Sequence, residues 1–402
     1  MIQIHNKALL KTIYIDRIIK KIEGKKEGPT VVFFGGIHGN ETAGVFALHS
    51  VLNNINADDV KGTVFRITGN IKALEKNQRF IEKDLNRIWT LENLESLENK
   101  DTHHPEELEQ IELYSILKNI LNSHKGPFYF IDLHTTSSRT LPFITINDSI
   151  INRKFSQLFP VPIVLGIEEY LNGPLLSYIN TLGYVSLGFE SGQHDDEHSI
   201  TCAIAFINLV LGYTDVVLKE NLENFEVYYN LLKLESLSIK DVFEIVHLHS
   251  IVNGEQFKML PNFNSFQNIS KGTPLAISDG KQLLAQYNSV MFMPLYQKRG
   301  NDGYFLIKKI KPFFLNLSIV LRRIKADSLL VLLPGISWDS KDKNALHVNL
   351  KVTKFLAKPI FHLLGYRNRR LDKTHLKIFN RERVSKIKIY RKEKWWFKFN
   401  PN

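Results

Sequence analysis

Residues 31–42 read VVFFGGIHGNET, and this stretch decides how the chain can fold. Residues 31–34 form a short apolar run of β-branched and aromatic side chains, closed by two glycines, which is typical of a strand buried on both faces. Residues 40–42 then lead into an apolar segment with helical spacing. The stretch therefore predicts a buried strand, a glycine turn and a helix.

The same alternation continues along the first half of the chain. We expect further strands at 62–67, 128–134, 163–165 and 184–190, and helices at 105–122 and 199–213. The helix over 105–122 has an acidic first turn, which suits the positive end of a helix dipole. Strands alternating with helices predict a layered α/β domain over roughly residues 1–215.

The pattern of predicted secondary structure changes after about residue 225. Short strand-like pieces alternate with turns rich in Gly, Asn, Asp and Pro, which is typical of a small β-rich domain. Residues 221–225 are a candidate linker. We therefore predict an α/β domain over 1–220, a β-rich domain over 225–325 and a basic, aromatic extension over 330–402.

Charge is concentrated in that extension. The whole chain carries a formal charge of +11, but residues 341–402 alone hold 18 Lys and Arg against four acids, which leaves residues 1–340 at −3. Basic side chains interleaved with aromatic ones, such as Tyr390, Trp395 and Trp396, suit single-stranded nucleic acid or an anionic membrane surface. The alternatives are a solvated basic appendage and an oligomer contact, and the sequence leaves a homo-oligomer open.

Composition excludes several classes of protein. With 44% hydrophobic and 23% charged residues in 402, the chain is not disordered, collagen-like or of low complexity. Its single cysteine, Cys202, rules out an internal disulfide and fits a reducing compartment. We find no secretory signal and no apolar run of the roughly 20 residues that a spanning helix needs, so we expect a soluble, cytoplasmic protein.

His38 and Glu41 follow directly after the first buried strand. An imidazole and a carboxylate three residues apart can reach one metal ion, and both groups suit zinc. The same spacing recurs at other histidines of this chain, but only His38 lies at a strand end after two glycines. Ligands bind at such ends in open α/β sheets. The alternative is a helix-capping turn with a partly buried histidine.

Other strand ends carry groups that could complete such a site. His134 ends the strand at 128–134 and is a candidate third ligand, and Asp132 lies two residues before it. Glu190 ends the strand at 184–190, and a carboxylate beside a metal-activated water is the usual general base of metal-assisted hydrolysis. His134 could instead be a satisfied core histidine, and Glu190 could merely cap a loop.

The segment at 78–87 supplies the cations of the candidate site. Arg79 and Arg87, with Asn86, could bind a substrate carboxylate or stabilise an oxyanion. They could equally be surface charges paired with Glu82 or Asp84, because exposed ion pairs are common and weak. The histidine pair at 194 and 198, in the acidic loop QHDDEH, is predicted to face solvent, although that loop could form part of the cleft rim.

Four motifs occur in a characteristic order: HGNE at 38–41, RxxxxDLNR at 79–87, DLHT at 132–135 and ESGQ at 190–193. As an ordered set they resemble the succinylglutamate desuccinylase/aspartoacylase family, which is related to zinc carboxypeptidases, over roughly residues 28–310. The resemblance implies a carboxypeptidase-like, three-layer α/β/α core with a mixed sheet and a smaller C-terminal β domain.

The resemblance also implies a role for each motif residue. It makes His38, Glu41 and His134 the ligands of one zinc ion, Glu190 the catalytic carboxylate, Arg79 the carbonyl-polarising arginine, and Asn86 with Arg87 the clamp on the substrate carboxylate. Tyr304 resembles the tyrosine that the C-terminal domain lends to the active site, and Tyr296 is a rival for that role.

The function implied is a zinc-dependent hydrolase that cleaves the amide bond of an N-acyl amino acid with metal-activated water, Glu190 serving as general base and acid. One departure concerns the substrate. No arginine lies between Tyr178 and Glu190, where the aspartoacylase branch carries one for an acidic side chain, so an acidic substrate is not secured. The alternatives are a metallo-carboxypeptidase acting on peptides, and a non-catalytic metal-binding module whose basic tail binds nucleic acid or an anionic membrane.

Overall fold

The structure is a computed structural model that describes residues 1–222, 224–339, 343–349, 351, 353, 358–370 and 375–398. Glu223, in the candidate linker, and parts of the predicted basic extension, among them 354–357 and 371–374, lie outside the described residues. No helix in the described part of the chain is both long and apolar enough to span a bilayer.

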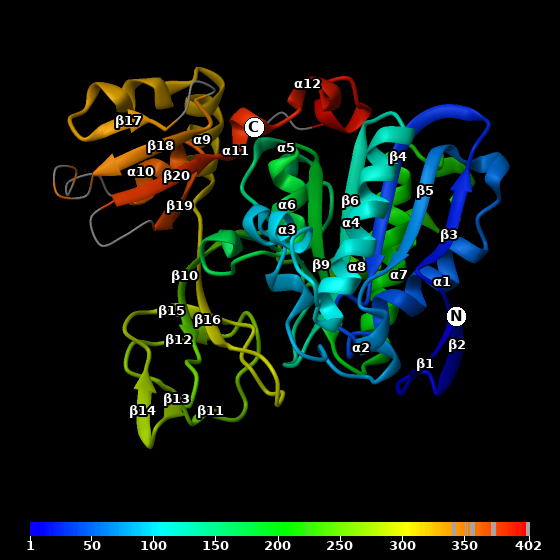
Figure 1. The fold of residues 1–402 in the computed structure, drawn as a ribbon, viewed down its shortest axis with the longest axis horizontal. Coiled ribbons are helices and arrows are strands. Elements are labelled where there is room, and N and C mark those ends of the chain that lie inside the picture. Colours follow the sequence, from blue (N-terminus) through cyan, green and yellow to red (C-terminus); the bar gives the residue numbers. More distant parts are fainter. Residues whose placement is uncertain are drawn as a thin grey trace.

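Within the described residues, eleven strands form one mixed sheet in the order β12-β15-β16-β10-β8-β7-β9-β6-β4-β5-β3 (Figure 1). Its central strands are β5 (Lys61–Thr68), β4 (Lys26–Gly35), β6 (Phe128–Thr136) and β9 (Val185–Gln193), all mutually parallel. β3 (Ile18–Glu23) pairs antiparallel at one edge. On the other side of β9 come β7 (Phe143–Ile146), which is antiparallel to it, and β8 (Ile163–Leu165).

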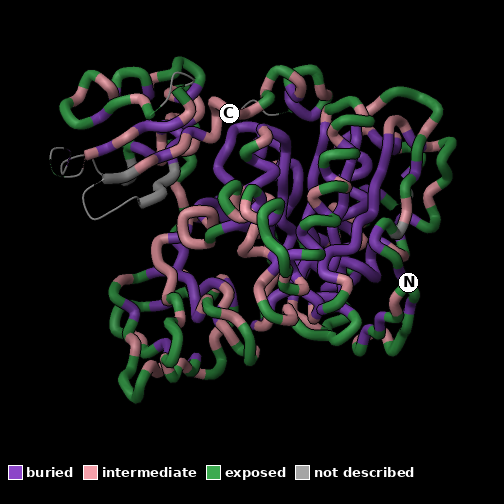
Figure 2. Tube along the Cα trace, in the orientation of Figure 1, coloured by how far each residue is buried: buried purple, intermediate pink, exposed green. Residues whose placement is uncertain are grey.

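Helices cover both faces of this sheet, so alternate residues of a central strand enter different cores. In β4, Val31 and Phe33 pack with α1 (Ala43–Asn53) and α7 (Glu197–Tyr213), whereas Val32 and Phe34 pack with α4 (Pro105–Ser123). α5 (Ile150–Ser156) and α8 (Phe225–Glu235) join the first core, and α3 (Leu91–Leu97) and α6 (Leu175–Thr181) join the second. Figure 2 shows the central strands buried along most of their length, and β6 is buried throughout. The predicted α/β fold with a mixed sheet is confirmed.

The sheet continues into the predicted β-rich region. β10 (Val242–Ser250) pairs parallel with β8, and β16 (Asp302–Lys309), β15 (Ser289–Phe292) and β12 (Asn268–Ile269) extend the sheet beyond it. A separate three-stranded sheet contains β11 (Phe257–Met259), β13 (Pro274–Ser278) and β14 (Lys281–Leu284). One sheet therefore runs through both predicted domains and does not mark a boundary between them. The boundary near 220–225 stays a prediction.

Several elements were not expected from the sequence. An N-terminal hairpin is formed by β1 (Ile2–Asn6) and β2 (Lys11–Ile15), and α2 (Ile71–Glu75) follows β5. The helix α8 lies where we expected strand-like segments after residue 225. Phe225, which we placed in the candidate linker, is buried against Tyr213, with ring centroids 5.3 Å apart.

The described part of the basic extension is folded. α9 (Pro312–Arg323) leads to a four-stranded antiparallel sheet of β17 (Ile336–Trp338), β18 (Ala345–Asn349), β20 (His375–Asn380) and β19 (Tyr366–Arg370), with α10 (Lys358–Leu363) before β19. α11 (Arg381–Val384) and α12 (Ile387–Tyr390) then lead back to the α/β core (Figure 1).

Residues 381–398, which we call the return segment, are anchored in the core by aromatic side chains. The Tyr390 hydroxyl accepts a hydrogen bond from the Val185 amide at 3.0 Å, and the Trp395 indole donates to the Tyr129 hydroxyl at 2.9 Å. Tyr390, Trp395 and Trp396 are buried. The interpretation of this segment as a solvated appendage is therefore wrong, and these three rings are not available to stack on bases.

Candidate functional site

The candidate site lies at the carboxyl ends of β4 and β6. The turn after β4 carries His38 and Glu41, and its glycines allow close packing: a Cβ at Gly39 would lie 2.1 Å from the Ala73 carbonyl carbon of α2. His134 lies near the end of β6, which pairs parallel with β4. Parallel strands present their carboxyl ends at one edge of a sheet, so the three side chains meet there.

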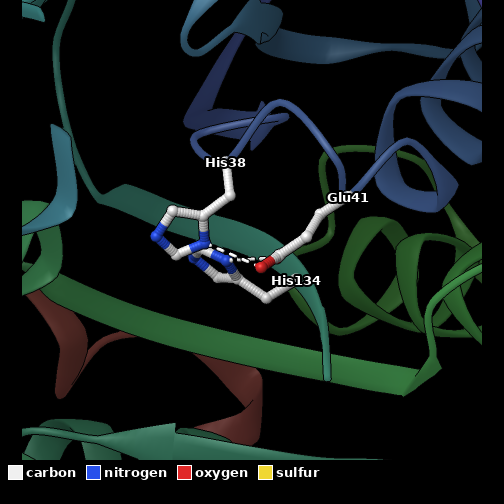
Figure 3. A group of neighbouring side chains, drawn as sticks. All are labelled: His38, Glu41 and His134. Carbon is white, nitrogen blue, oxygen red and sulfur yellow. Dashed lines mark hydrogen bonds and ion pairs between the residues drawn. The ribbon is translucent and has the colours of Figure 1, made fainter. Parts of the chain in front are cut away.

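The Glu41 carboxylate lies beside both imidazoles and contacts each ring with one of its oxygens (Figure 3). His38 Nδ1 is 2.8 Å from Glu41 Oε1, and His134 Nδ1 is 2.9 Å from Glu41 Oε2. Burial alone would raise the pKa of Glu41, but His38 and His134 together hold it well below its usual range. All three residues are buried, and their candidate ligand atoms lie within 4.8 Å of one another. Two imidazoles and one carboxylate are a donor set that fits zinc or a similar divalent ion.

Two further carboxylates contact the Nε2 atoms of these rings, which are the nitrogens that do not face Glu41. Asp132 Oδ2 lies 2.7 Å from His134 Nε2, and Asp84 Oδ1 lies 3.2 Å from His38 Nε2. Histidine ligands of metals almost always bond a carboxylate or carbonyl through the nitrogen that faces away from the ion. This pattern makes the donor set a stronger fit to a metal site than the three residues would be alone.

Glu190 lies beside this group on β9, where it is the register partner of His134. It is 8% exposed, and its Oε2 is buried without a hydrogen-bond partner among the described residues. Burial, assisted by the nearby Glu41 carboxylate, raises the pKa of Glu190 to about 7 against the opposing effect of His134. A carboxyl with such a pKa can both take up and release a proton near neutral pH.

Arg79 belongs to the same cluster. Its guanidinium donates to Glu41 Oε1 at 3.3 Å and to Asp84 Oδ2 at 3.2 Å, and its side chain is 13% exposed. Its Nε is buried with no acceptor in the described part of the chain. The pairing with Asp84 that the surface interpretation supposed is present, but the pair is largely buried, so its placement on the surface is wrong.

The cluster described above lines a cavity with a volume of about 110 Å³. Asn86 and Arg87 line this cavity too. The Asn86 side-chain oxygen accepts a hydrogen bond from the Leu175 amide at 2.9 Å, which ties this turn to the start of α6. Arg87 donates to Asp302 Oδ2 on β16 at 2.7 Å, so its partner comes from the β-rich region. Arg87 is not paired with Glu82 or Asp84 as the surface interpretation supposed.

Tyr304 and Tyr296 do not line this cavity. The Tyr304 ring packs nearly parallel to His249, with centroids 5.6 Å apart, in a separate hollow of the β-rich region. Tyr296 is 41% exposed, and its hydroxyl donates to the Leu260 carbonyl at 2.7 Å. The structure therefore does not bring the predicted tyrosine to the site.

The prediction that His194 faces solvent is wrong. Its amide donates to the Thr136 carbonyl at 2.9 Å, which continues the alignment of β9 with β6 beyond Gln193. The imidazole is then turned into the cavity, where Nδ1 lies 2.7 Å from the Thr135 hydroxyl and burial lowers the pKa of the ring. In the sequence, the position of His194 only four residues after Glu190 was the one indication that it could reach the site. His198 is exposed as expected.

Comparison with known proteins identifies the class to which this fold and site belong. Residues 27–172 match the family model described as the succinylglutamate desuccinylase/aspartoacylase catalytic domain. Mouse aspartoacylase is 31% identical over 173 residues, which is 40% of this chain and 54% of that protein. Succinylglutamate desuccinylase from Pseudoalteromonas atlantica is 24% identical over 280 residues, covering 65% of this chain and 76% of that protein.

Solved structures agree on the fold. A succinylglutamate desuccinylase/aspartoacylase from Rhodobacter sphaeroides superposes with a TM-score of 0.55 at 15% identity, covering 77% of this chain and 94% of that one. The ectoine utilization protein EutE (DoeB) from Ruegeria pomeroyi gives 0.52 at 17% identity, covering 72% and 87%.

The fold is that of the solved succinylglutamate desuccinylase/aspartoacylase structures. Residues 27–172 are similar in sequence to the catalytic domain of that deacylase family. The match to mouse aspartoacylase spans about half the length of that relative.

Proposed function

We propose that this protein is a zinc-dependent hydrolase that cleaves the amide bond of N-acyl amino acids, a carbon–nitrogen bond other than a peptide bond. The observation that carries the proposal is the convergence of His38, Glu41 and His134 beside the buried carboxyl of Glu190. Similarity to the catalytic domain of a deacylase family supports the same reaction class.

His38, Glu41 and His134 would hold the metal, with Asp84 and Asp132 fixing the two imidazole rings. A zinc ion bound by such a set supplies Lewis-acid activation of water and of a carbonyl oxygen. The chain's own residues then have to position the substrate and move protons.

Glu190 is the residue proposed to move the proton. With a pKa of about 7 it can accept a proton from the attacking water and pass it to the leaving amine nitrogen. Arg79, whose Nε has no acceptor among the described residues, is proposed to donate to the oxygen that becomes negative in the transition state. Asn86 and Arg87 are proposed to orient the free carboxylate of the substrate.

The test is hydrolysis of a panel of N-acyl amino acids and of short peptides, with and without a chelator. Removal of the metal should abolish hydrolysis of the N-acyl amino acids, because the Lewis acid is lost, and one equivalent of Zn²⁺ per chain should restore it. Peptides should be cleaved poorly. Full activity in demonstrably metal-free protein, or a preference for peptides, would contradict the proposal.

A further prediction concerns Asp132, the buried carboxylate that bonds Nε2 of His134. Replacing such a residue typically weakens metal binding by about 10–100-fold. Asp132→Ala should therefore lower zinc affinity by that factor, measured by competition with a chromophoric chelator. Asp58→Ala, at a 66% exposed carboxylate remote from the site, is the matched control. Equal affinities in the two variants would remove Asp132 from the metal site.

A further inference from the structure

The cavity of the candidate site has an apolar region whose residues are not used in the proposed chemistry. We give this name to the apolar lining side chains from β7, the turn after β8, α6 and the β-rich region: Ile146, Ile167, Leu171, Leu176, Met293 and Phe305. Four of them, Ile167, Leu171, Met293 and Phe305, pack in one hydrophobic cluster. In the sheet, β7 and β8 lie on one side of β9, whereas β6 and β4, which lead to the candidate ligands, lie on the other. A substrate that spans β9 would therefore extend from the reaction centre into this region.

The positively charged side chains of the cavity are already paired with carboxylates of the chain. Among the described residues that line it, only Arg79 and Arg87 carry a permanent positive charge, and no lysine is present. Arg79 bonds to Glu41 and Asp84, and Arg87 bonds to Asp302.

Two neutral polar side chains of the cavity are paired with each other. Asn147 donates to the Ser177 hydroxyl at 3.1 Å. Both residues line the cavity.

This arrangement discriminates between substrates by their charge. An N-acyl amino acid has one free carboxylate. Arg87 can bind it if this carboxylate replaces Asp302 as the partner of the guanidinium. A second carboxylate, on the side chain or on the acyl group, would leave water without any unpaired cation to receive it, which is unfavourable. An apolar group gains instead, by roughly fourfold in binding for each methylene that it buries.

We infer that the substrate of this site carries an uncharged, apolar group on its side chain or its acyl part, and no second carboxylate. The inference rests on the proposed function, because it concerns the same reaction centre. Arg87 and Asp302 then act as an exchangeable pair for the single carboxylate, and the apolar region is the specificity determinant.

The first experiment compares four probes on the zinc-loaded protein. N-acetyl-leucine tests an apolar side chain, N-hexanoylglycine an apolar acyl group, N-acetylaspartate an acidic side chain and N-succinylglutamate an acidic acyl group. For the better apolar probe we expect a kcat/KM at least about tenfold above that of either acidic probe. Equal or better hydrolysis of an acidic probe would overturn the inference and leave the proposed function intact.

A binding measurement distinguishes failure of this inference from failure of the proposed function. Glu190→Gln, saturated with zinc, is titrated with the same probes by calorimetry. If the wild-type protein hydrolyses none of them but the variant binds the apolar probes more tightly, the inference stands and the proposed function fails. If no probe is hydrolysed and none binds, or the acidic probes bind more tightly, the inference is overturned.

A charge placed in the apolar region should reverse the preference. Leu176 and Leu171 both line the cavity and are half-buried, so an arginine at either position can reach the second carboxylate of an acidic substrate. Leu176→Arg, or Leu171→Arg if the first variant does not fold, should raise the ratio of kcat/KM for acidic over apolar probes at least about tenfold. Leu234→Arg, at a 73% exposed position on α8, should leave that ratio unchanged. A folded cavity variant with an unchanged ratio would overturn the inference.

Discussion

Glu190→Gln should lower kcat by about 10²–10⁴-fold, because the amide keeps the shape of the side chain but cannot accept a proton. The variant should still bind one zinc ion per chain, since Glu190 is not in the His38, Glu41 and His134 group. The measurement is single-substrate kinetics on the best N-acyl amino acid, together with the zinc content of the purified protein.

Glu95→Gln makes the same chemical change at an exposed position on α3 and should leave kcat unaltered. Full turnover in Glu190→Gln would end the assignment of Glu190 as the group that moves the proton. Loss of zinc from the variant would show that Glu190 acts through the metal site instead.

Trp395→Ala should lower the free energy of unfolding by about 3–5 kcal/mol, the usual cost of removing a large buried aromatic ring. Trp395 is 2% exposed, lies with its ring centroid 5.2 Å from that of Phe155, and donates to the Tyr129 hydroxyl. The substitution therefore leaves a cavity beside β6 and removes a hydrogen bond there. Urea denaturation followed by circular dichroism measures the change.

Phe397→Ala is the matched control, because Phe397 lies two residues away in the return segment but is 72% exposed. It should change the free energy of unfolding by less than about 0.5 kcal/mol. Similar unfolding curves for the two variants would mean that the return segment does not stabilise the core.

Much of the core could be predicted because its signals are local. Residues 31–34 are apolar without interruption, since β4 is covered by helices on both faces, and the glycines after them mark the turn that carries His38 and Glu41. His134 and Glu190 could be placed at the same end of the sheet because each lies near the carboxyl end of an apolar strand. The structure brings these residues, with Arg79, Asn86 and Arg87, to one cavity.

What could not be predicted depends on pairing between distant segments. The partner of Arg87 is Asp302, 215 positions further on, and no local pattern announces it. Tyr304 was placed in the site by resemblance, but on β16 it is the neighbouring Phe305 that lines the cavity. Successive strand residues point to opposite sides, so a match that is loose by one position can select the wrong side chain.

α8 was missed although a local signal was present. Phe225, Tyr228, Leu231 and Leu232 have the spacing of three and four residues that is typical of an amphipathic helix, and they pack on the first core. The return segment was misjudged for a different reason. Its high charge dominated the composition, whereas its structure depends on a few aromatic residues that are buried beside β6 and β9.

The return segment has a consequence for biosynthesis. A chain leaves the ribosome from its N-terminal end, so β6 and β9 emerge long before Tyr390 and Trp395, which cover Phe128, Tyr129 and Val185. Until then these strands expose apolar surface and unpaired backbone groups, a state prone to aggregation. Nascent chains stalled before residue 381 should therefore engage chaperones, and release of the return segment should end that dependence.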